Sequence, residues 1–295
     1  MPWQDHLERL RKYFADLRLG EMRLTDLGRA ARENVGRATA GLGGIELGGL
    51  ATDLRVALAF YTRLPMAQST PIDGAAVARA SWCSPIAGVV IGIVAAFVYW
   101  ASVRLHLPQF VAAALAVAAS MLFTGCLHED GLADTADGFG GATRTQALEI
   151  MRDGRIGTFG ACALIISFAL RVGALNDLPK TSLVAWALIG AHAAARAGLP
   201  LFMRALPPAR PDGLAAQAGA PTPRRAIAAA LLGILILWIA LGTAAALVAI
   251  VYMLIGNLVL ALVARRKLGG QTGDVLGTAE QVGECIVLLT TAAWF

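Results

Sequence analysis

Long apolar stretches constrain the fold of this 295-residue chain more than any other feature of its sequence. A helix needs about 20 consecutive apolar residues to cross the hydrocarbon core of a bilayer. Hydrophobic residues make up 57% of the chain and charged residues only 15%, which excludes an ordinary soluble enzyme. We predict an all-α, polytopic helical bundle in a membrane, with about seven transmembrane helices at residues 84–103, 109–127, 159–175, 182–203, 227–244, 246–264 and 276–295.

The first 50 residues differ from the rest. Apolar residues recur at helical spacing in Trp3, Leu7, Leu10, Phe14 and Leu17, and a glycine-rich segment follows at 36–50. This pattern predicts an amphipathic N-terminal extension and linker at 1–50, ahead of a membrane-embedded domain at 51–295. The net charge of +5 is typical of cytoplasmic loops in a membrane protein, and we expect no nucleic-acid partner.

Basic residues gather in the N-terminal region, in the loop at 140–155, at 204–225 and at 265–267. Seven spans with a cytoplasmic N-terminus place all of these loops on one side, as the positive-inside rule requires. We therefore expect a multi-pass protein of the inner, cytoplasmic membrane of a bacterium, with its polar loops in the cytoplasm. Arg171 and Arg196 fall inside predicted spans, where a charge is expected to face the protein interior.

An island of charge runs from Leu127 to Gly160. Asp130, Asp134 and Asp137 stand at i, i+4 and i+7, which places them on one stripe of a helix. Three carboxylates this close repel one another unless a cation neutralises them, and oxygen ligands suit Mg²⁺. We predict that these three aspartates bind Mg²⁺. Glu129 points away from the stripe and is expected to be solvated or to play an indirect role.

Further along the same stretch, Arg152 and Arg155 alternate with Asp153. Arginines that make bidentate hydrogen bonds to phosphate oxygens, beside carboxylates that bind a metal, are typical of phosphoryl-transfer sites. We assign Arg152 and Arg155 to substrate binding and Asp153 to catalysis or metal binding, with His128 as a second candidate for the base. Intrahelical salt bridges are the structural alternative. Arg63, in FYTRLP, is a further candidate phosphate contact.

The C-terminal segment GGQTGD at 269–274 is a glycine-rich turn. The backbone N–H groups of Gly270 and Gly273 could bind phosphate, and Asp274 could bind metal or ribose. We predict that this turn completes the site built by residues 127–160. In the alternative interpretation, Asp274 only caps the last helix.

Four motifs in one order carry a resemblance: FYTRLP, LHEDGLADTADG, EIMRDGRIGTFG and LGGQTGDVLGTAEQVGE. Together they resemble the cobalamin synthase family, the adenosylcobinamide-GDP ribazoletransferases, over about residues 53–295. The resemblance implies a Mg²⁺-dependent transferase in the membrane. It would join adenosylcobinamide-GDP to α-ribazole or its 5′-phosphate and release GMP, the final step of cobalamin nucleotide-loop assembly. We expect the 5′-hydroxyl or its phosphate-bearing analogue to approach the cobinamide-side phosphorus. A homo-oligomer is compatible with this interpretation.

Two alternatives stay open at this point. Another aspartate-rich membrane transferase, of the CDP-alcohol phosphotransferase or prenyltransferase type, would also bind Mg²⁺ and a diphosphate, although DGLADTADG lacks the arginine of the CDP-alcohol motif. A divalent-cation transporter would instead carry acids deep inside several spans.

Overall fold

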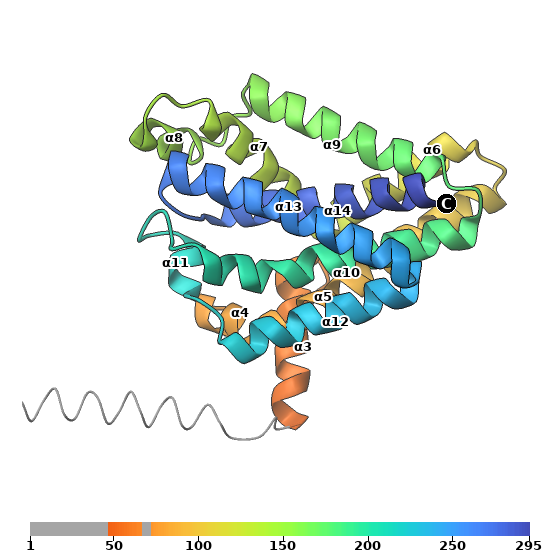
Figure 1. The fold of residues 1–295 in the computed structure, drawn as a ribbon, viewed down its shortest axis with the longest axis horizontal. Coiled ribbons are helices and arrows are strands. Elements are labelled where there is room, and N and C mark those ends of the chain that lie inside the picture. The colour runs from red at the N-terminus through yellow and green to blue at the C-terminus, as the bar shows by residue number, and fades with distance from the viewer. Residues whose placement is uncertain (1–46, 67–71) are drawn as a thin grey trace, which may run out of the picture. The chain divides into compact units, whose positions relative to one another are not determined.

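The computed structural model of the chain describes residues 47–66 and 72–295. In these ranges the secondary structure is helical, with a single isolated bridge between Pro208 and Gln271. The predicted extension at 1–50 lies almost wholly outside the described residues. The elements shown in Figure 1 are α3 (Leu47–Tyr61), α4 (Gly74–Ala80), the 3₁₀ helix η1 (Ser81–Cys83), α5 (Ser84–Arg104), α6 (Gln109–Thr124), α7 (Leu127–Phe139), α8 (Arg144–Ile150), α9 (Thr158–Asn176), α10 (Thr181–Ala205), α11 (Leu214–Ala218), α12 (Pro223–Leu241), α13 (Thr243–Leu268) and α14 (Gly273–Trp294).

Five helical segments are long and apolar enough to cross a membrane: Gly74–Arg104, Thr158–Asn176, Thr181–Ala205, Pro223–Leu241 and Thr243–Leu268. A sixth is added if α6 and α7, which meet at 91°, are counted as one broken span. The all-helical membrane fold is therefore confirmed, whereas the count of seven is not. The predicted span at 276–295 corresponds to α14, which carries Asp274, Glu280 and Glu284 and is not one of these segments.

Two helices organise the packing of residues 50–295. Helix α10 packs against α5, α12 and α14, and α14 in turn packs against α7, α9 and α13 (Figure 1). Small residues allow these close approaches. A Cβ added at Gly88 of α5 would collide with the backbone of α10 at His192, and one at Gly283 of α14 would press on Ala195. Packing through small residues is what membrane helices use where apolar burial gives little driving force.

The turn between α6 and α7 places the acidic stretch. Gly125 and Cys126 both adopt left-handed conformations, with φ of 68° and 58°. Such a pair ends α6 and turns the chain, and the left-handed region is unfavourable for a residue such as Cys126 that has a Cβ. The predicted span at 109–127 therefore ends early, at Thr124. Helix α7 leaves the turn as a short acidic helix outside the five candidate spans.

Candidate active site

The aspartate stripe is helical, as predicted. Asp130, Asp134 and Asp137 all lie within α7. Their environments differ along the helix: Asp130 is exposed, Asp134 is half-buried and Asp137 is buried. The stripe therefore runs from solvent into the protein, and the three carboxylates are not equivalent.

The start of α14 packs directly on this stripe. The Thr278 hydroxyl donates a hydrogen bond to the Gly131 carbonyl at 3.1 Å. A Cβ added at Gly131 would come within 2.8 Å of the Asp274 carbonyl oxygen, so glycine is required where the two helices touch. The predicted meeting of the GGQTGD segment with residues 127–160 is thus present in the structure, although more than a hundred residues separate them in sequence.

The acids at this contact influence one another. Burial, and then the carboxylates of Asp130, Asp274 and Asp137, raise the pKa of Asp134 from 3.8 to about 6. Burial also raises the pKa of Asp274, opposed by the hydrogen bond from Thr272 and the charge of Arg210. The Arg210 guanidinium lies 3.5 Å from the Asp274 carboxylate. We call Asp130, Asp134 and Asp274 the acid cluster.

Asp274 does not cap α14. The Thr272 hydroxyl accepts the hydrogen bond from the Val275 N–H at 3.2 Å and donates one to the Asp274 carboxylate at 3.1 Å. Thr272 is therefore the N-cap residue, and the alternative role for Asp274 as the cap is wrong. The Asp274 carboxylate is left to face α7 and Arg210.

The 269–274 turn packs against the 207–209 segment. Gln271 exchanges backbone hydrogen bonds with the 207–209 segment: the Gln271 N–H donates to the Pro207 carbonyl at 2.9 Å, and the Ala209 N–H donates to the Gln271 carbonyl at 2.8 Å. A Cβ at Gly270 would collide with the Pro207 carbonyl, whereas Gly273 is exposed and has open space around it. Phosphate binding by these two glycines stays a prediction, and only Gly273 is placed in the open.

Asp137 has backbone partners at the start of α9. Its carboxylate accepts hydrogen bonds from the N–H groups of Gly157 at 2.7 Å and Gly160 at 2.9 Å. A Cβ at Gly157 would lie 2.5 Å from the same carboxylate, and one at Gly160 would also collide with it. This contact explains two glycines of the RDGRIGTFG motif. The Asp137 carboxylate thus connects α7 to the start of α9, which is a structural role and not the metal binding that we predicted for it.

The loop between α8 and α9 carries two exposed ion pairs. Arg152 pairs with Asp212 at 2.5 Å, and the Arg155 Nε donates to Asp153 at 3.0 Å. The hydrogen bond from Arg155 lowers the pKa of Asp153, which makes this carboxylate a weak base at neutral pH. Both arginines are thus held in ion pairs, but neither pair is the intrahelical salt bridge of the alternative, because residues 152–155 follow the end of α8 at Ile150 and Asp212 lies in another loop. Substrate binding by Arg152 and Arg155 stays a prediction.

Arg63 lies at the turn between α6 and α7. Its backbone N–H donates to the Phe123 carbonyl at 2.8 Å, and its guanidinium lies over Gly125, where an added Cβ would collide with it. Glycine at position 125 thus satisfies two requirements at once, the left-handed backbone and the space for Arg63. The side chain of Arg63 is exposed next to the start of α7.

His128 is enclosed instead of facing substrate. Its side chain is 4% exposed, its Nδ1 lies 3.2 Å from Arg196 and 3.6 Å from Glu280, and its ring stacks on Tyr61. A general base needs a path to the proton that it accepts. Burial therefore speaks against the predicted catalytic role of His128.

His128 belongs to a set of buried charged side chains that we call the buried network. Arg171 donates to Glu129 at 3.1 Å and to Glu284 at 3.2 Å. Arg196 lies 2.6 Å from Glu280, and His192 lies 3.2 Å from Glu284. The expectation that Arg171 and Arg196 face the interior is confirmed. We expected Glu129 to be solvated or to act indirectly. It is not solvated, because it is 5% exposed and paired.

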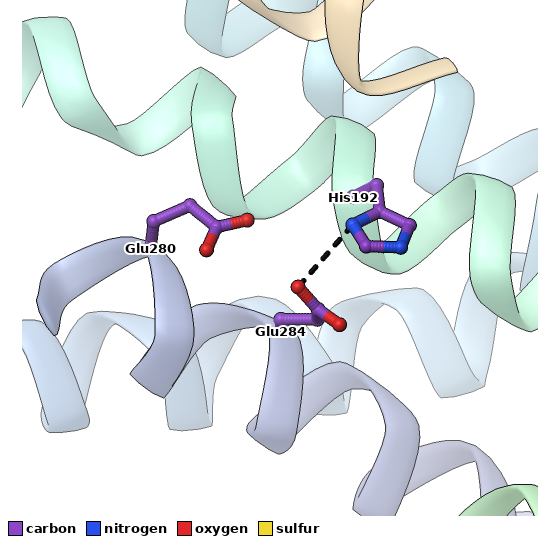
Figure 2. Close-up of side chains that lie close together, drawn as sticks. All are labelled: His192, Glu280 and Glu284. Atoms are coloured by element: carbon purple, nitrogen blue, oxygen red, sulfur yellow. Dashed lines mark ion pairs between the residues drawn. The ribbon is translucent and has the colours of Figure 1, made fainter. Parts of the chain in front are cut away.

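Three members of the network have the composition of a metal site. His192, Glu280 and Glu284 converge from α10 and α14, with one ligand atom of each within 4.8 Å of the others (Figure 2). Arg196 Nη1, however, lies 2.6 Å from Glu280 and 3.2 Å from His192 Nδ1. The guanidinium already supplies the positive charge between these atoms, which disfavours a metal ion at this position.

The sequence carries two signals for the network that only become informative when they are combined. Arg171 and Arg196 lie in predicted spans, and Glu280 and Glu284 stand four residues apart, on one helix face. Because a charge inside a bundle needs a partner, two arginines within spans point to two glutamates within another apolar helix. No comparable signal singles out His192, which stands alone among apolar residues.

The acid cluster suits Mg²⁺. Its donors are carboxylate oxygens, which this hard cation prefers, and Asp130 opens the cluster to solvent. The pKa of Asp134 is raised by burial and then by the neighbouring carboxylates, and among the described residues Arg210 is the one cation that pairs with the cluster. A bound divalent cation would remove this repulsion.

The comparisons with known proteins agree with the motifs. The family model described as cobalamin-5-phosphate synthase matches residues 53–292. An adenosylcobinamide-GDP ribazoletransferase of Bradyrhizobium diazoefficiens is 54% identical over 82% of this chain and 94% of its own length. Proteins of the same name from Mesorhizobium japonicum and Azorhizobium caulinodans are 45% and 43% identical over 81% and 80% of this chain, and over 92% and 94% of their own lengths.

No solved structure matches this chain at a significant level. The family model covers α5 to α13 completely and nearly all of α14, and therefore every residue of the acid cluster. The chain belongs to the cobalamin-5-phosphate synthase family.

Proposed function

We propose that this protein joins adenosylcobinamide-GDP to α-ribazole, or to its 5′-phosphate, in a Mg²⁺-dependent reaction that releases GMP. The observation that carries the proposal is the 54% identity, over 82% of the chain, to a relative named for this activity. The geometry supports it. A diphosphate with Mg²⁺ is what a solvent-facing set of oxygen ligands beside an arginine would recognise.

Asp130, Asp134 and Asp274 would hold the Mg²⁺. When bound, the ion would neutralise charge on the diphosphate. Arg210, 3.5 Å from Asp274, can offer its guanidinium to a phosphate oxygen. Arg152, Arg155 and Arg63 are exposed and stay candidates for further phosphate contacts.

The reaction replaces a phosphoanhydride bond with a phosphoester bond. A ribose hydroxyl oxygen forms a bond to the cobinamide-side phosphorus, the bond to the GMP oxygen breaks, and the hydroxyl proton passes to water. One of the two acceptors carries a phosphate at its 5′ position, so the attacking hydroxyl is one that both acceptors share. This replaces our expectation of a 5′-hydroxyl. The protein has mainly to position the two substrates and stabilise charge.

We also propose that the site faces the cytoplasm from the cytoplasmic membrane of a bacterium. The acid cluster shares its end of the bundle with basic segments, since Lys267 donates to the Phe139 carbonyl at 3.0 Å and Arg144 to the Ala209 carbonyl at 2.8 Å. Basic loops favour the cytoplasmic side. Cysteines introduced at the exposed positions Gly154 and Leu107 should react with a membrane-impermeant thiol reagent from opposite sides. Labelling from the same side would contradict this orientation.

The assay uses full-length protein in detergent with adenosylcobinamide-GDP, α-ribazole and Mg²⁺. Cobamide and GMP should appear in equal amounts, stop on addition of EDTA and resume with excess Mg²⁺. Folded protein that forms neither product would contradict the proposal. Transport of a divalent cation is less well supported, because the acids inside the bundle are paired with Arg171 and Arg196.

A further inference from the structure

An apolar groove of about 310 Å³ lies between α10, α12 and α13. It follows α10 from Ala194 to Ala205 and α13 from Ile250 to Ala261. At 1.5 Å per residue, each of these stretches is about 16 Å long. This is half of a hydrocarbon core of about 30 Å, so the groove has the depth of one leaflet.

The groove is open because small residues line it. A Cβ built on Gly198 would have no neighbour within 4 Å, which places this glycine at the empty part of the groove. The polar side chain of Asn257 donates to the Met253 carbonyl at 3.0 Å. Its amide is therefore partly satisfied within α13, and the wall remains suited to an apolar ligand.

Positive charge stands at one end of the groove. Arg265 follows Ala261 by four residues, so it continues the same face of α13 by one turn. Helix α12 begins at this end with Arg224, and α10 ends there with Arg204, whose guanidinium donates to the Pro221 carbonyl at 2.7 Å. Arg224 and Arg265 are exposed, and among the described residues the side chain of neither has an ion-pair or hydrogen-bond partner.

We propose that this groove binds one acyl chain of an anionic phospholipid, with the lipid phosphate at Arg224 and Arg265. The depth of one leaflet and the basic end fit this ligand together, because basic pockets between transmembrane helices bind anionic head groups.

Native mass spectrometry of the full-length protein in detergent tests the proposal with two probes, dioleoyl phosphatidylglycerol and dioleoyl phosphatidylcholine. Wild-type protein should bind one phosphatidylglycerol roughly ten-fold more tightly than phosphatidylcholine. Gly198→Leu should fill the groove and lose this binding. Gly173→Leu is the matched control, because Gly173 is an exposed helical glycine of α9 that also has open space around it.

A second variant tests the head group without altering the groove. Arg224→Gln combined with Arg265→Gln should retain bound lipid but bind the two lipids equally. Equal binding of the two lipids by wild-type protein would overturn the proposal, as would retention of phosphatidylglycerol by Gly198→Leu at the level of Gly173→Leu. A wild-type dimer that only Gly198→Leu dissociates would assign the groove to a second copy and would also overturn it. None of these results depends on the transferase activity.

Discussion

Helices α7 and α14 contribute acidic residues to two groups of charged side chains, and the two groups differ in how far arginines neutralise them. The acid cluster holds three carboxylates against one arginine, Arg210, at 3.5 Å. The buried network holds the carboxylates of Glu129, Glu280 and Glu284 against two arginines, with two histidines beside them. Glu129 and Asp130 are neighbours in sequence, yet each belongs to a different group.

The two groups differ in how many arginines neutralise them, and this difference distinguishes a ligand site, the acid cluster, from a structural contact, the buried network. Inside the bundle, water cannot compensate a charge, so the protein must supply the partner itself. At the solvent-facing acid cluster, compensation can come from a cation that arrives with the substrate. A helix turns by about 100° per residue, which is why Glu129 faces the bundle and Asp130 faces solvent. The following predictions test whether the two groups can be disrupted separately.

The largest expected effect comes from removing Arg171. Arg171→Leu leaves Glu129 and Glu284 buried without a guanidinium, and breaking a buried ion pair in this way costs about 3–5 kcal/mol. We expect a large fall in the thermal unfolding temperature in detergent. Arg266→Leu, which removes an exposed arginine, is the control. Removing Glu129 as well, in Arg171→Leu with Glu129→Leu, should recover part of the loss, and an unchanged unfolding temperature in Arg171→Leu would disprove the structural role of the network.

Asp134→Asn should strongly reduce turnover without loss of fold. The substitution keeps the shape of the side chain and removes one charge from a crowded cluster, so the unfolding temperature without Mg²⁺ should be equal or higher. We expect GMP release to fall by about a hundredfold or more, the scale on which removal of a charge-stabilising group acts. Glu149→Gln, at an exposed acid on α8, should retain activity. Normal turnover by Asp134→Asn at saturating Mg²⁺ would remove Asp134 from the site.

Asp274→Asn should have a smaller effect. Thr272 caps α14, so the substitution leaves the helix start intact and changes only the charge that faces α7 and Arg210. We expect the Mg²⁺ concentration for half-maximal GMP release to rise by roughly ten-fold, which corresponds to about 1.4 kcal/mol. Thr272→Val supplies the contrast, because loss of the cap should lower the unfolding temperature and leave the Mg²⁺ requirement close to that of wild type. The opposite pattern would make Asp274 structural.

The smallest effect concerns pH. The folded-state pKa of Asp134 is raised from 3.8 to about 6, so its contribution to folding is most favourable below pH 3.8 and is lost as the pH rises through about 6. Without Mg²⁺, wild type should therefore lose stability relative to Asp134→Asn between about pH 4 and 7. Saturating Mg²⁺ should remove this difference above pH 6. Parallel pH profiles of unfolding temperature for the two proteins, without Mg²⁺, would contradict the shifted pKa.

The sequence predicted the helices better than it predicted the partners of their polar side chains. The division of residues 227–264 into two helices and the aspartate stripe of α7 were predicted from local spacing, and both are present, with the first of the two helices ending at Leu241. The early end of α6 depends on the left-handed backbone conformation of Cys126. A cysteine seldom adopts this conformation, so its residue type did not predict the turn. The span count depends on α14, whose acids obscure an otherwise apolar helix.

Roles that depend on tertiary contact could not be predicted in the same way. Asp137 and Asp134 share one stripe, yet Asp137 accepts hydrogen bonds from Gly157 and Gly160 because α9 begins beside it. Thr272, and not Asp274, caps α14, although either residue type is suited to the position. Spacing within one helix reveals which side chains share a face, and it does not reveal what the rest of the chain places opposite them.

Binding of Mn²⁺, followed by electron paramagnetic resonance on the full-length protein in detergent, tests the distinction between the two groups most directly. Mn²⁺ accepts the same oxygen ligands as Mg²⁺ and is detectable when free. We predict saturable binding by wild-type protein that is lost in Asp134→Asn and retained in Glu284→Gln, because Arg171 and Arg196 already neutralise the network. Binding that survives Asp134→Asn and disappears in Glu284→Gln would place the metal at His192, Glu280 and Glu284 and would contradict this account.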